Sequence, residues 1–200
     1  MAEIGSVPAI GAVAAVVLAA GLSRRYGPDS KLHAELGGKF LALHIADTLC
    51  HMGFGHRIAV CQPDDPLGPA FRARGFDVVL NPDSGRGMAS SLALGVTAAR
   101  EAGSEAVLIC LADMPFVSAA HLMGLVDALD GESDIVASAT AVSDVPPTPP
   151  AIFGKAHFTA LAGLTGDKGA RSLLGEARIV VAPAQMLADF DTPDDFSATR

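Results

Sequence analysis

The sequence VAAVVLAAGLSRRYG, residues 13–27, contains the pattern that decides the fold. Its first part, Val13–Ala20, is apolar at every position, and a glycine and then basic side chains follow it. A continuous apolar run of this length is typical of a strand buried on both faces, as in a parallel sheet. Small residues after such a strand let backbone N–H groups approach a ligand closely. We therefore expect a central strand that ends in a ligand-binding loop.

Apolar segments of strand length recur along the chain and alternate with segments of helical periodicity. The further expected strands are residues 57–61, 77–80, 106–111, 135–138 and 178–181. Expected helices cover 41–52, 88–99, 121–129 with Ser118 as N-cap, and 155–163. This alternation predicts an α/β fold whose largely parallel sheet is covered on both faces. We interpret the proline-rich segment 143–150 as a loop between sheet elements.

Length and composition favour one domain over residues 1–200, of which 1–11 form a flexible N-terminal extension. Half of the 200 residues are hydrophobic, which disfavours intrinsic disorder. The longest apolar stretch, Ala9–Leu22, is shorter than the ~20 residues of a transmembrane helix, so we expect no membrane association. No basic residue precedes that stretch, which disfavours a secretory signal.

Charge and cysteine content narrow the function classes. The formal net charge is −8, from 14 basic and 22 acidic residues, which disfavours nucleic-acid binding. Cys50, Cys61 and Cys110 are odd in number and widely spaced, so we interpret them as reduced residues of a cytoplasmic protein in preference to a disulfide.

Ligands of open parallel sheets gather where strands end, so residues after each expected strand are candidates. After the first strand, Arg25 and Lys31 bring positive charge to a glycine-containing loop, which suits phosphates. The spacing is not that of a P-loop, and a turn with solvated basic residues is the alternative.

Two further glycine-containing segments carry alternatives of their own. GRGMAS, residues 85–90, nearly matches a dinucleotide fingerprint, but it does not follow the first strand. A helix N-terminus that holds ribose, base or phosphate is the other functional interpretation, and a glycine turn is the structural one. The segment 166–171 is a charged loop, for which a solvated turn is the simpler interpretation by itself.

Carboxylates at two strand ends suggest a metal site. Asp113 follows the apolar strand 106–111, where it could be an N-cap or a metal ligand. Near the C-terminus, Thr192 through Asp195 have the pattern of a helix start, with Pro193 at the first helical position. That pattern leaves Asp191 and Asp189 unexplained. A second carboxylate beside Asp113 would make a magnesium site that clamps phosphates.

Taken together, these segments resemble the nucleotidyltransferases of molybdenum-cofactor biosynthesis, and among them the cytidylyltransferases. The segments that carry the resemblance, in family order, are LAAGLSRRYG (18–27) with Lys31, GMASSL (87–92), ADMP (112–115), LTGDKGARSLL (164–174) and DFDTPDDF (189–196). The resemblance implies a three-layer α/β/α sandwich, Rossmann-like, with a mostly parallel mixed sheet.

The resemblance also implies roles for individual residues. The segment along the base and ribose would be Leu18, Ala19, Ala20 and Gly21. The triphosphate would contact Ser23, Arg25 and Lys31, and the nucleoside Gly87 and Ser91. Mg²⁺ would be held by Asp113 and Asp191, and Arg25, Lys31 and Asp113 would be catalytic. The acceptor would face Asp167, Lys168 and Arg171.

Guanylyl members of this family tend to carry LAGG and cytidylyl members LAAG, and Ala20 stands at the deciding position. We therefore expect CMP transfer from CTP to the terminal phosphate of molybdopterin or molybdenum cofactor, with a molybdoenzyme or its chaperone as a protein partner. Three alternatives stay open: guanylyl or other nucleotidyl transfer to a sugar phosphate, a nicotinamide-dependent oxidoreductase, and a non-catalytic nucleotide-binding chaperone.

Overall fold

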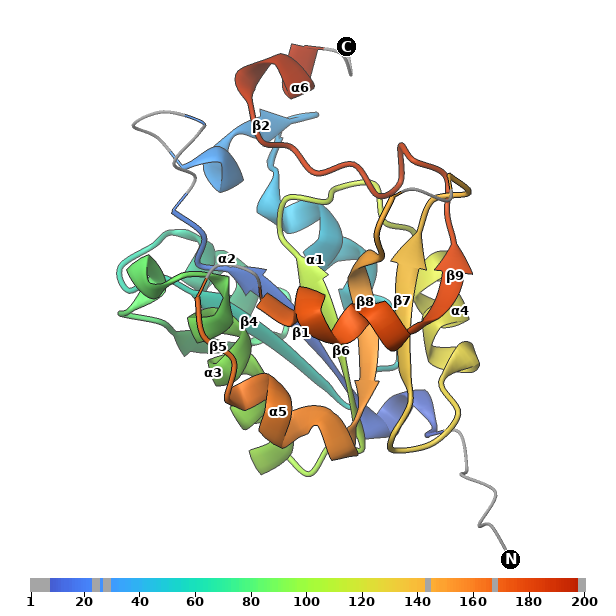
Figure 1. Ribbon diagram of the computed structural model, residues 1–200. Coiled ribbons are helices and arrows are strands. Elements are labelled where there is room, and N and C mark those ends of the chain that lie inside the picture. Colours follow the sequence, from blue (N-terminus) through green and yellow to red (C-terminus); the bar gives the residue numbers. More distant parts are fainter. Residues whose placement is uncertain (1–7, 23–25, 27–29, 143–144, 167–168, 198–200) are drawn as a thin grey trace, which may run out of the picture.

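The computed structural model describes residues 8–22, 26, 30–142, 145–166 and 169–197, and a seven-stranded sheet forms its centre (Figure 1). Its strands are β1 (Val13–Ala19), β4 (His56–Cys61), β5 (Asp77–Leu80), β6 (Ala106–Leu111), β7 (Ile135–Ala139), β8 (Thr148–Gly154) and β9 (Arg178–Val181). They lie in the order β5-β4-β1-β6-β8-β7-β9. β8 runs antiparallel to β6 and β7, and the other pairings are parallel.

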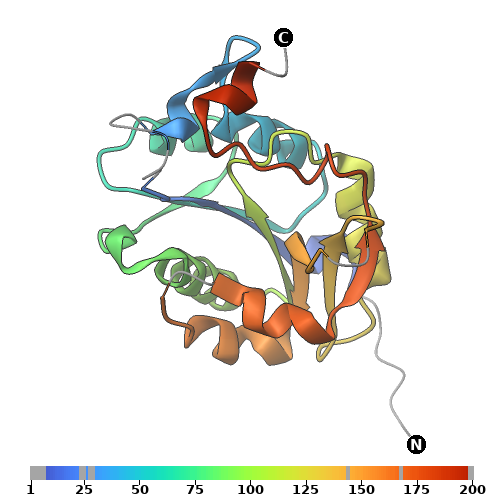
Figure 2. The same cartoon turned by 45° about the horizontal axis from the view of Figure 1, so that its top comes forward.

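Two layers of helices cover this sheet. Alternate residues of β1 belong to two separate hydrophobic clusters, because successive side chains of a strand point to opposite faces. Val13 and Val17 pack in one cluster with apolar residues of α1 (Ala42–Cys50), α2 (Leu67–Arg72) and α4 (Ala119–Ala128). Val16 packs in the other with α3 (Met88–Glu101) and α5 (Phe158–Ala162). Figure 2 shows α3 and α5 on the face opposite to α1.

Shorter elements complete the described chain. The strands β2 (Glu35–Leu36) and β3 (Lys39–Phe40) form a small hairpin, and α6 (Pro193–Ser197) ends the described chain. Short 3₁₀ helices occupy Ile10–Ala12, Lys31–His33, Ser84–Arg86, Lys155–His157 and Gly169–Glu176.

A glycine sets the distance between α3 and the sheet. A Cβ atom at Gly95 would lie 2.5 Å from Cγ1 of Val16 in β1. Only the absence of a side chain lets the two backbones approach this closely. The N-terminus of α3 is thereby held beside the end of β1, where the candidate site lies.

The sequence predicted the fold class and most elements correctly. The expected three-layer arrangement with a mostly parallel mixed sheet is confirmed, and the predicted strands match within one residue at each end. The predicted N-cap is confirmed as well, because the Ser118 side chain accepts a hydrogen bond from the His121 N–H at 3.2 Å.

The loop predicted for residues 143–150 is wrong at its end, because β8 begins at Thr148. Pro149 and Pro150 have no N–H groups to donate, which made a strand unexpected there. The pairing of β7 with β8 shifts register between Ala137 and Ser138, next to these prolines. The shift accommodates the two residues without a donor. The short helix α2 was also not predicted.

None of the described helices is both long and apolar enough to cross a membrane. The cysteines Cys50, Cys61 and Cys110 are free thiols. Burial raises the pKa of Cys61 and of Cys110 to about 12, so both stay protonated in the core.

Candidate active site

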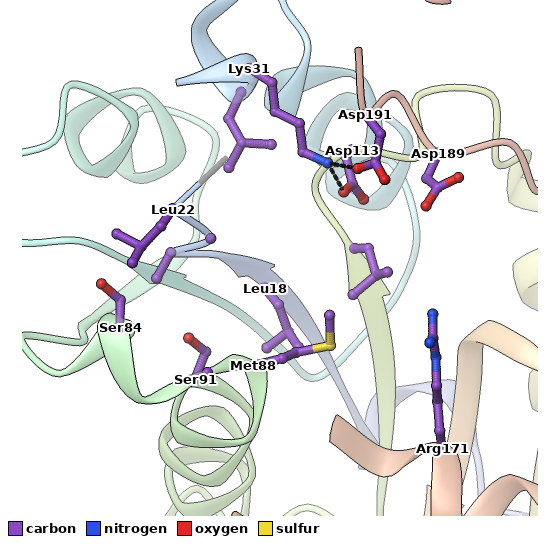
Figure 3. A pocket seen from close by; sticks show the side chains of 16 residues that line it. Leu18, Leu22, Lys31, Ser84, Met88, Ser91, Asp113, Arg171, Asp189 and Asp191 are labelled. Carbon is purple, nitrogen blue, oxygen red and sulfur yellow. Dashed lines mark hydrogen bonds and ion pairs between the residues drawn. The ribbon is translucent and has the colours of Figure 1, made fainter. Parts of the chain in front are cut away.

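A cavity of about 410 Å³ opens where β1 and β6 end (Figure 3). Segments far apart in the sequence line it: the end of β1, the start of the Lys31–His33 turn, the beginning of α3, the end of β6 and the segment before α6. Ligands of open α/β sheets bind at this kind of edge. The cavity is therefore the candidate active site.

Lys31 lies between two carboxylates at the rim of the cavity. Its Nζ atom donates to Oδ2 of Asp113 at 2.7 Å and to Oδ1 of Asp191 at 2.5 Å. The side chains of Lys31 and Asp113 are only 12% and 18% exposed, so water screens this pair weakly. Lys31, predicted for phosphate binding, and Asp113 and Asp191, predicted for metal binding, thus form one charged cluster.

The ammonium group of Lys31 and the two carboxylates stabilise one another's charged forms. Burial alone would lower the pKa of Lys31, but the attraction and hydrogen bonds of Asp113 and Asp191 outweigh it and raise the pKa. Burial raises the pKa of Asp113, against the opposing attraction of the Lys31 ammonium. Lys31 therefore keeps its positive charge at neutral pH.

The segment around Asp191 is held in place by backbone hydrogen bonds. The Phe190 N–H donates to the Asp113 carbonyl oxygen at 3.0 Å, which ties this segment to the end of β6. Oδ2 of Asp195 accepts hydrogen bonds from the N–H groups of Thr192 and Asp191 at 2.7 and 2.9 Å, and these lower the pKa of Asp195. The predicted helix start is confirmed, because α6 begins at Pro193. The hydrogen bonds to Asp195 fix the backbone that carries Asp191.

The donor set fits a hard divalent cation. Oδ1 of Asp113 is buried and finds no hydrogen-bond partner within the described ranges, so it remains available as a ligand. Among the residues that the structure describes, no three His, Cys, Asp or Glu side chains come together in a way that could hold a metal ion. Asp113 and Asp191 alone suit Mg²⁺, which keeps several waters and shares substrate phosphates with one or two carboxylates.

The opposite side of the cavity suits a nucleoside. Leu18, Ala20 and Gly21 line it from β1 and the loop that follows. Gly87 lines it from the N-cap position of α3, and Ser91 from the first turn of that helix. These five predicted residues are thus brought together. The predicted residue Ala19 is not among the lining residues, because its side chain packs in the cluster on the other face of β1.

Of the other predicted site residues, one lines the cavity and four are not described by the structure. Arg171 lines the cavity from the 3₁₀ helix 169–176. Ser23, Arg25, Asp167 and Lys168 lie outside the described residues.

Several lining residues had no assigned role. The sequence pattern gives Asp189 no role, and in the structure its charge helps raise the pKa of Asp113. Met88 is 40% exposed at the first position of α3, and the signal available in the sequence was a methionine directly after Gly87 at the start of an expected helix. The remaining unassigned lining residues are Leu22, Leu32, Ser84, Gly85 and Leu111.

A second, smaller cavity of about 80 Å³ adjoins the first. The two share Met88, Leu111, Arg171 and Asp189. Most of its other lining residues are apolar, among them Ile109 of β6 and Phe153 of β8. The site therefore has two adjoining compartments, which share one cationic and one anionic side chain, those of Arg171 and Asp189.

Comparisons with known proteins show the family and the fold of the chain. The family described as MobA-like NTP transferase domain matches residues 15–181. The purine catabolism protein PucB of Bacillus subtilis (strain 168) is 32% identical over 199 residues, covering 92% of this chain and 94% of that protein.

Solved structures show the same fold. Rv0371c from Mycobacterium tuberculosis H37Rv is 27% identical with a TM-score of 0.74, covering 93% of this chain and 96% of that one. Its complex with manganese is also known, at 25% identity and a TM-score of 0.68, covering 94% and 97% of the chains. The nucleotidyl transferase Mth528 from Methanothermobacter thermautotroptrophicus has a TM-score of 0.78 at 22% identity, covering 94% and 95%.

Proposed function

The chain belongs to the MobA-like NTP transferase family, and on that premise we propose that it transfers CMP from CTP to the terminal phosphate of molybdopterin or molybdenum cofactor, releasing pyrophosphate. The observation that carries this proposal is the cluster of Lys31, Asp113 and Asp191 at the rim of a nucleoside-sized cavity. The fold and the family of the chain are those of nucleotidyltransferases. The donor, the acceptor and the metal are the proposed parts.

The choice of CTP rests on position 20. Ala20 lines the cavity beside Gly21, and a side chain there leaves less room for a base than a glycine would. This favours a pyrimidine over a purine. Leu18, Gly21, Gly87 and Ser91 complete the proposed nucleoside contacts.

The proposed transfer needs no general base, because the acceptor phosphate is already an anion at neutral pH. One of its oxygens attacks the α-phosphorus, the bond from that phosphorus to the bridging oxygen breaks, and pyrophosphate leaves with the electron pair. Positioning and electrostatic stabilisation supply most of the catalysis in such reactions. Lys31, which keeps its charge, is proposed to stabilise the triphosphate together with Ser23 and Arg25.

Asp113 and Asp191 are proposed to hold Mg²⁺, for which carboxylate oxygens are suited. Oδ1 of Asp113 has no hydrogen-bond partner among the residues that the structure describes. When bound, the ion supplies positive charge beside the phosphates. The manganese complex of the mycobacterial relative supports a divalent cation in this family.

The acceptor is proposed to enter from the side of the smaller cavity. Arg171 lies where the two compartments meet and carries a charge that suits an anionic group. Asp167 and Lys168 are proposed to act with it. The Bacillus relative is named for purine catabolism and not for a reaction, so the acceptor is what an experiment must identify.

The test is pyrophosphate release by the purified protein with Mg²⁺ and either molybdopterin or a sugar phosphate as the acceptor, with CTP, GTP and ATP compared. We expect release with CTP in preference to the other two. Release with GTP would contradict the base assignment, and release only with a sugar phosphate would contradict the acceptor. CTP binding without any release would contradict catalysis and favour a nucleotide-binding chaperone.

A further inference from the structure

A buried asparagine connects the end of β5 with the first turn of α3. Asn81 follows β5 directly and is 1% exposed. Its backbone N–H donates to the Cys61 carbonyl oxygen at 2.8 Å, which anchors it to the sheet. Its amide group is therefore held rigidly beneath the cavity wall formed by α3.

The orientation of this amide follows from its partners. The backbone N–H of Asp83 points at one atom of the amide, at 3.0 Å, and an N–H group can only donate. The atom that it meets must be Oδ1. Nδ2 therefore faces α3, where it donates to Oγ of Ser90 and to Oγ of Ser91, both at 2.9 Å.

The two serines differ in where their own hydroxyl hydrogens go. The Ser90 hydroxyl has two backbone acceptors, the carbonyl oxygens of Gly87 at 2.8 Å and of Asp83 at 3.3 Å, so its hydrogen is used within the protein. The Ser91 hydroxyl accepts from Asn81, and no residue in the described part of the chain accepts its hydrogen. Ser91 lines the cavity, and Figure 3 shows its hydroxyl directed into it.

We infer that Asn81 is a positioning residue that makes Ser91 a hydrogen-bond donor toward the nucleoside of the bound nucleotide. Because Nδ2 occupies the acceptor side of the Ser91 oxygen, the hydroxyl hydrogen is left for the ligand. The matching ligand atom is an acceptor: a base carbonyl oxygen, a ring nitrogen without hydrogen, or a ribose oxygen. This inference rests on the proposed function only in taking the ligand to be a nucleotide.

Asn81→Asp tests the polarity with little change of shape. A carboxylate has no hydrogen to donate, so the Ser91 hydroxyl would turn to donate to it and be lost to the ligand. We expect CTP binding, measured by titration calorimetry with Mg²⁺, to weaken about three- to tenfold, as for loss of one neutral hydrogen bond. Ser91→Ala should weaken it to a similar extent. Asn81→Asp in the Ser91→Ala background should cause little further loss, because Asn81 acts through Ser91.

Ser90→Ala is the matched control, because it removes the other partner of Asn81 but no group that lines the cavity. It should bind CTP like the natural protein. Inorganic triphosphate, which has no nucleoside, should bind equally to all variants. If Asn81→Asp weakens triphosphate binding as much as CTP binding, charge or general disruption explains the loss and the inference is wrong.

Two further outcomes separate this inference from the proposed function. If the natural protein binds none of CTP, GTP and ATP, both the proposed function and this inference fail. If CTP binds but Asn81→Asp and Ser91→Ala bind it normally, only the inference fails. Should Asn81→Asp not fold, Asn81→Ala and its combination with Ser91→Ala give the same coupling test. Weaker binding of 2′-deoxy-CTP to the natural protein, but not to Ser91→Ala, would identify the ribose as the source of the acceptor atom.

Discussion

The Nζ atom of Lys31 lies 2.7 Å from Oδ2 of Asp113, although 82 positions separate the two residues in the chain. Their side chains meet at the carboxyl edge of the sheet because β1 and β6 are neighbouring parallel strands. Each residue follows one of these strands. The pairing of strands thereby brings an ammonium group to the carboxylates that are proposed to bind the metal.

Lys31→Met should lower the turnover number roughly 100-fold, the size typical for loss of one strong electrostatic contact in a transition state. The effect on folding should be smaller, because Asp113, whose pKa burial already raises, can take up a proton when its partner is lost. Rates of pyrophosphate release and melting temperatures would measure both. Lys39→Met is the control, because its ammonium pairs with Asp47 and does not line the cavity. Full activity of Lys31→Met would remove Lys31 from the mechanism.

Asp113→Asn should abolish stabilisation of the protein by divalent cations. A cation that binds only the folded state at about 100 times its Kd stabilises it by ~2.7 kcal/mol. We expect Mg²⁺ or Mn²⁺ to raise the melting temperature of the natural protein but not of this variant, and turnover to be lost with it. Asp77→Asn, at an exposed position of β5, should respond to the cations normally. A normal cation response in Asp113→Asn would show that the metal binds elsewhere.

His121 should make the fold sensitive to mild acid. Its Nε2 atom lies 2.7 Å from Oγ of Ser138, which donates to the Pro150 carbonyl oxygen, so Nε2 donates to Ser138. Burial lowers the pKa of His121 below 6.5. The unfolded chain therefore binds the proton more readily, and stability falls as the pH decreases below 6.5.

We expect urea unfolding of the natural protein to show a loss of free energy between about pH 7 and pH 5 that is smaller in His121→Gln. His51→Gln changes an exposed histidine and should keep the full pH dependence. Identical pH profiles of His121→Gln and the natural protein would contradict this assignment.

Gly95→Ala should destabilise the fold by about 1–3 kcal/mol, the usual cost of overpacking a core. The new Cβ atom would lie 2.5 Å from Cγ1 of Val16, so α3 would have to move away from β1. Gly124→Ala in α4 is the control, because its Cβ would lie 3.7 Å from its nearest neighbour, in ordinary contact. This control should be neutral or stabilising, since alanine favours helix. Equal stability of both variants would show that α3 can shift without cost.

The parts of the fold that were predictable are those with strong local signals. β1 and β6 are buried along nearly their whole length, so each gives an uninterrupted apolar run. β8 was missed because it begins with Thr148 and two prolines, and its place between β6 and β7 depends on the rest of the sheet. α2 is six residues long and contains Gly68 and Pro69, too short and too irregular for a helical period to be visible.

The part of the candidate site that could be predicted from the sequence consists of residues that follow buried strands. Motif residues at strand ends, such as Lys31 and Asp113, could be named because the end of a buried strand is visible in the sequence. Asn81 had no such signal beyond its place after β5, because its role depends on which atoms its amide meets.

The sequence by itself determined the α/β class, the central strand and the residue types that are proposed to bind phosphate, metal and nucleoside. These follow from hydrophobic periodicity and from residues close together along the chain. Only the tertiary structure decided that Lys31 lies between Asp113 and Asp191 and that Asn81 orients Ser91. Such contacts depend on strand order and helix packing, which bring distant residues within hydrogen-bond distance and which local periodicity does not encode.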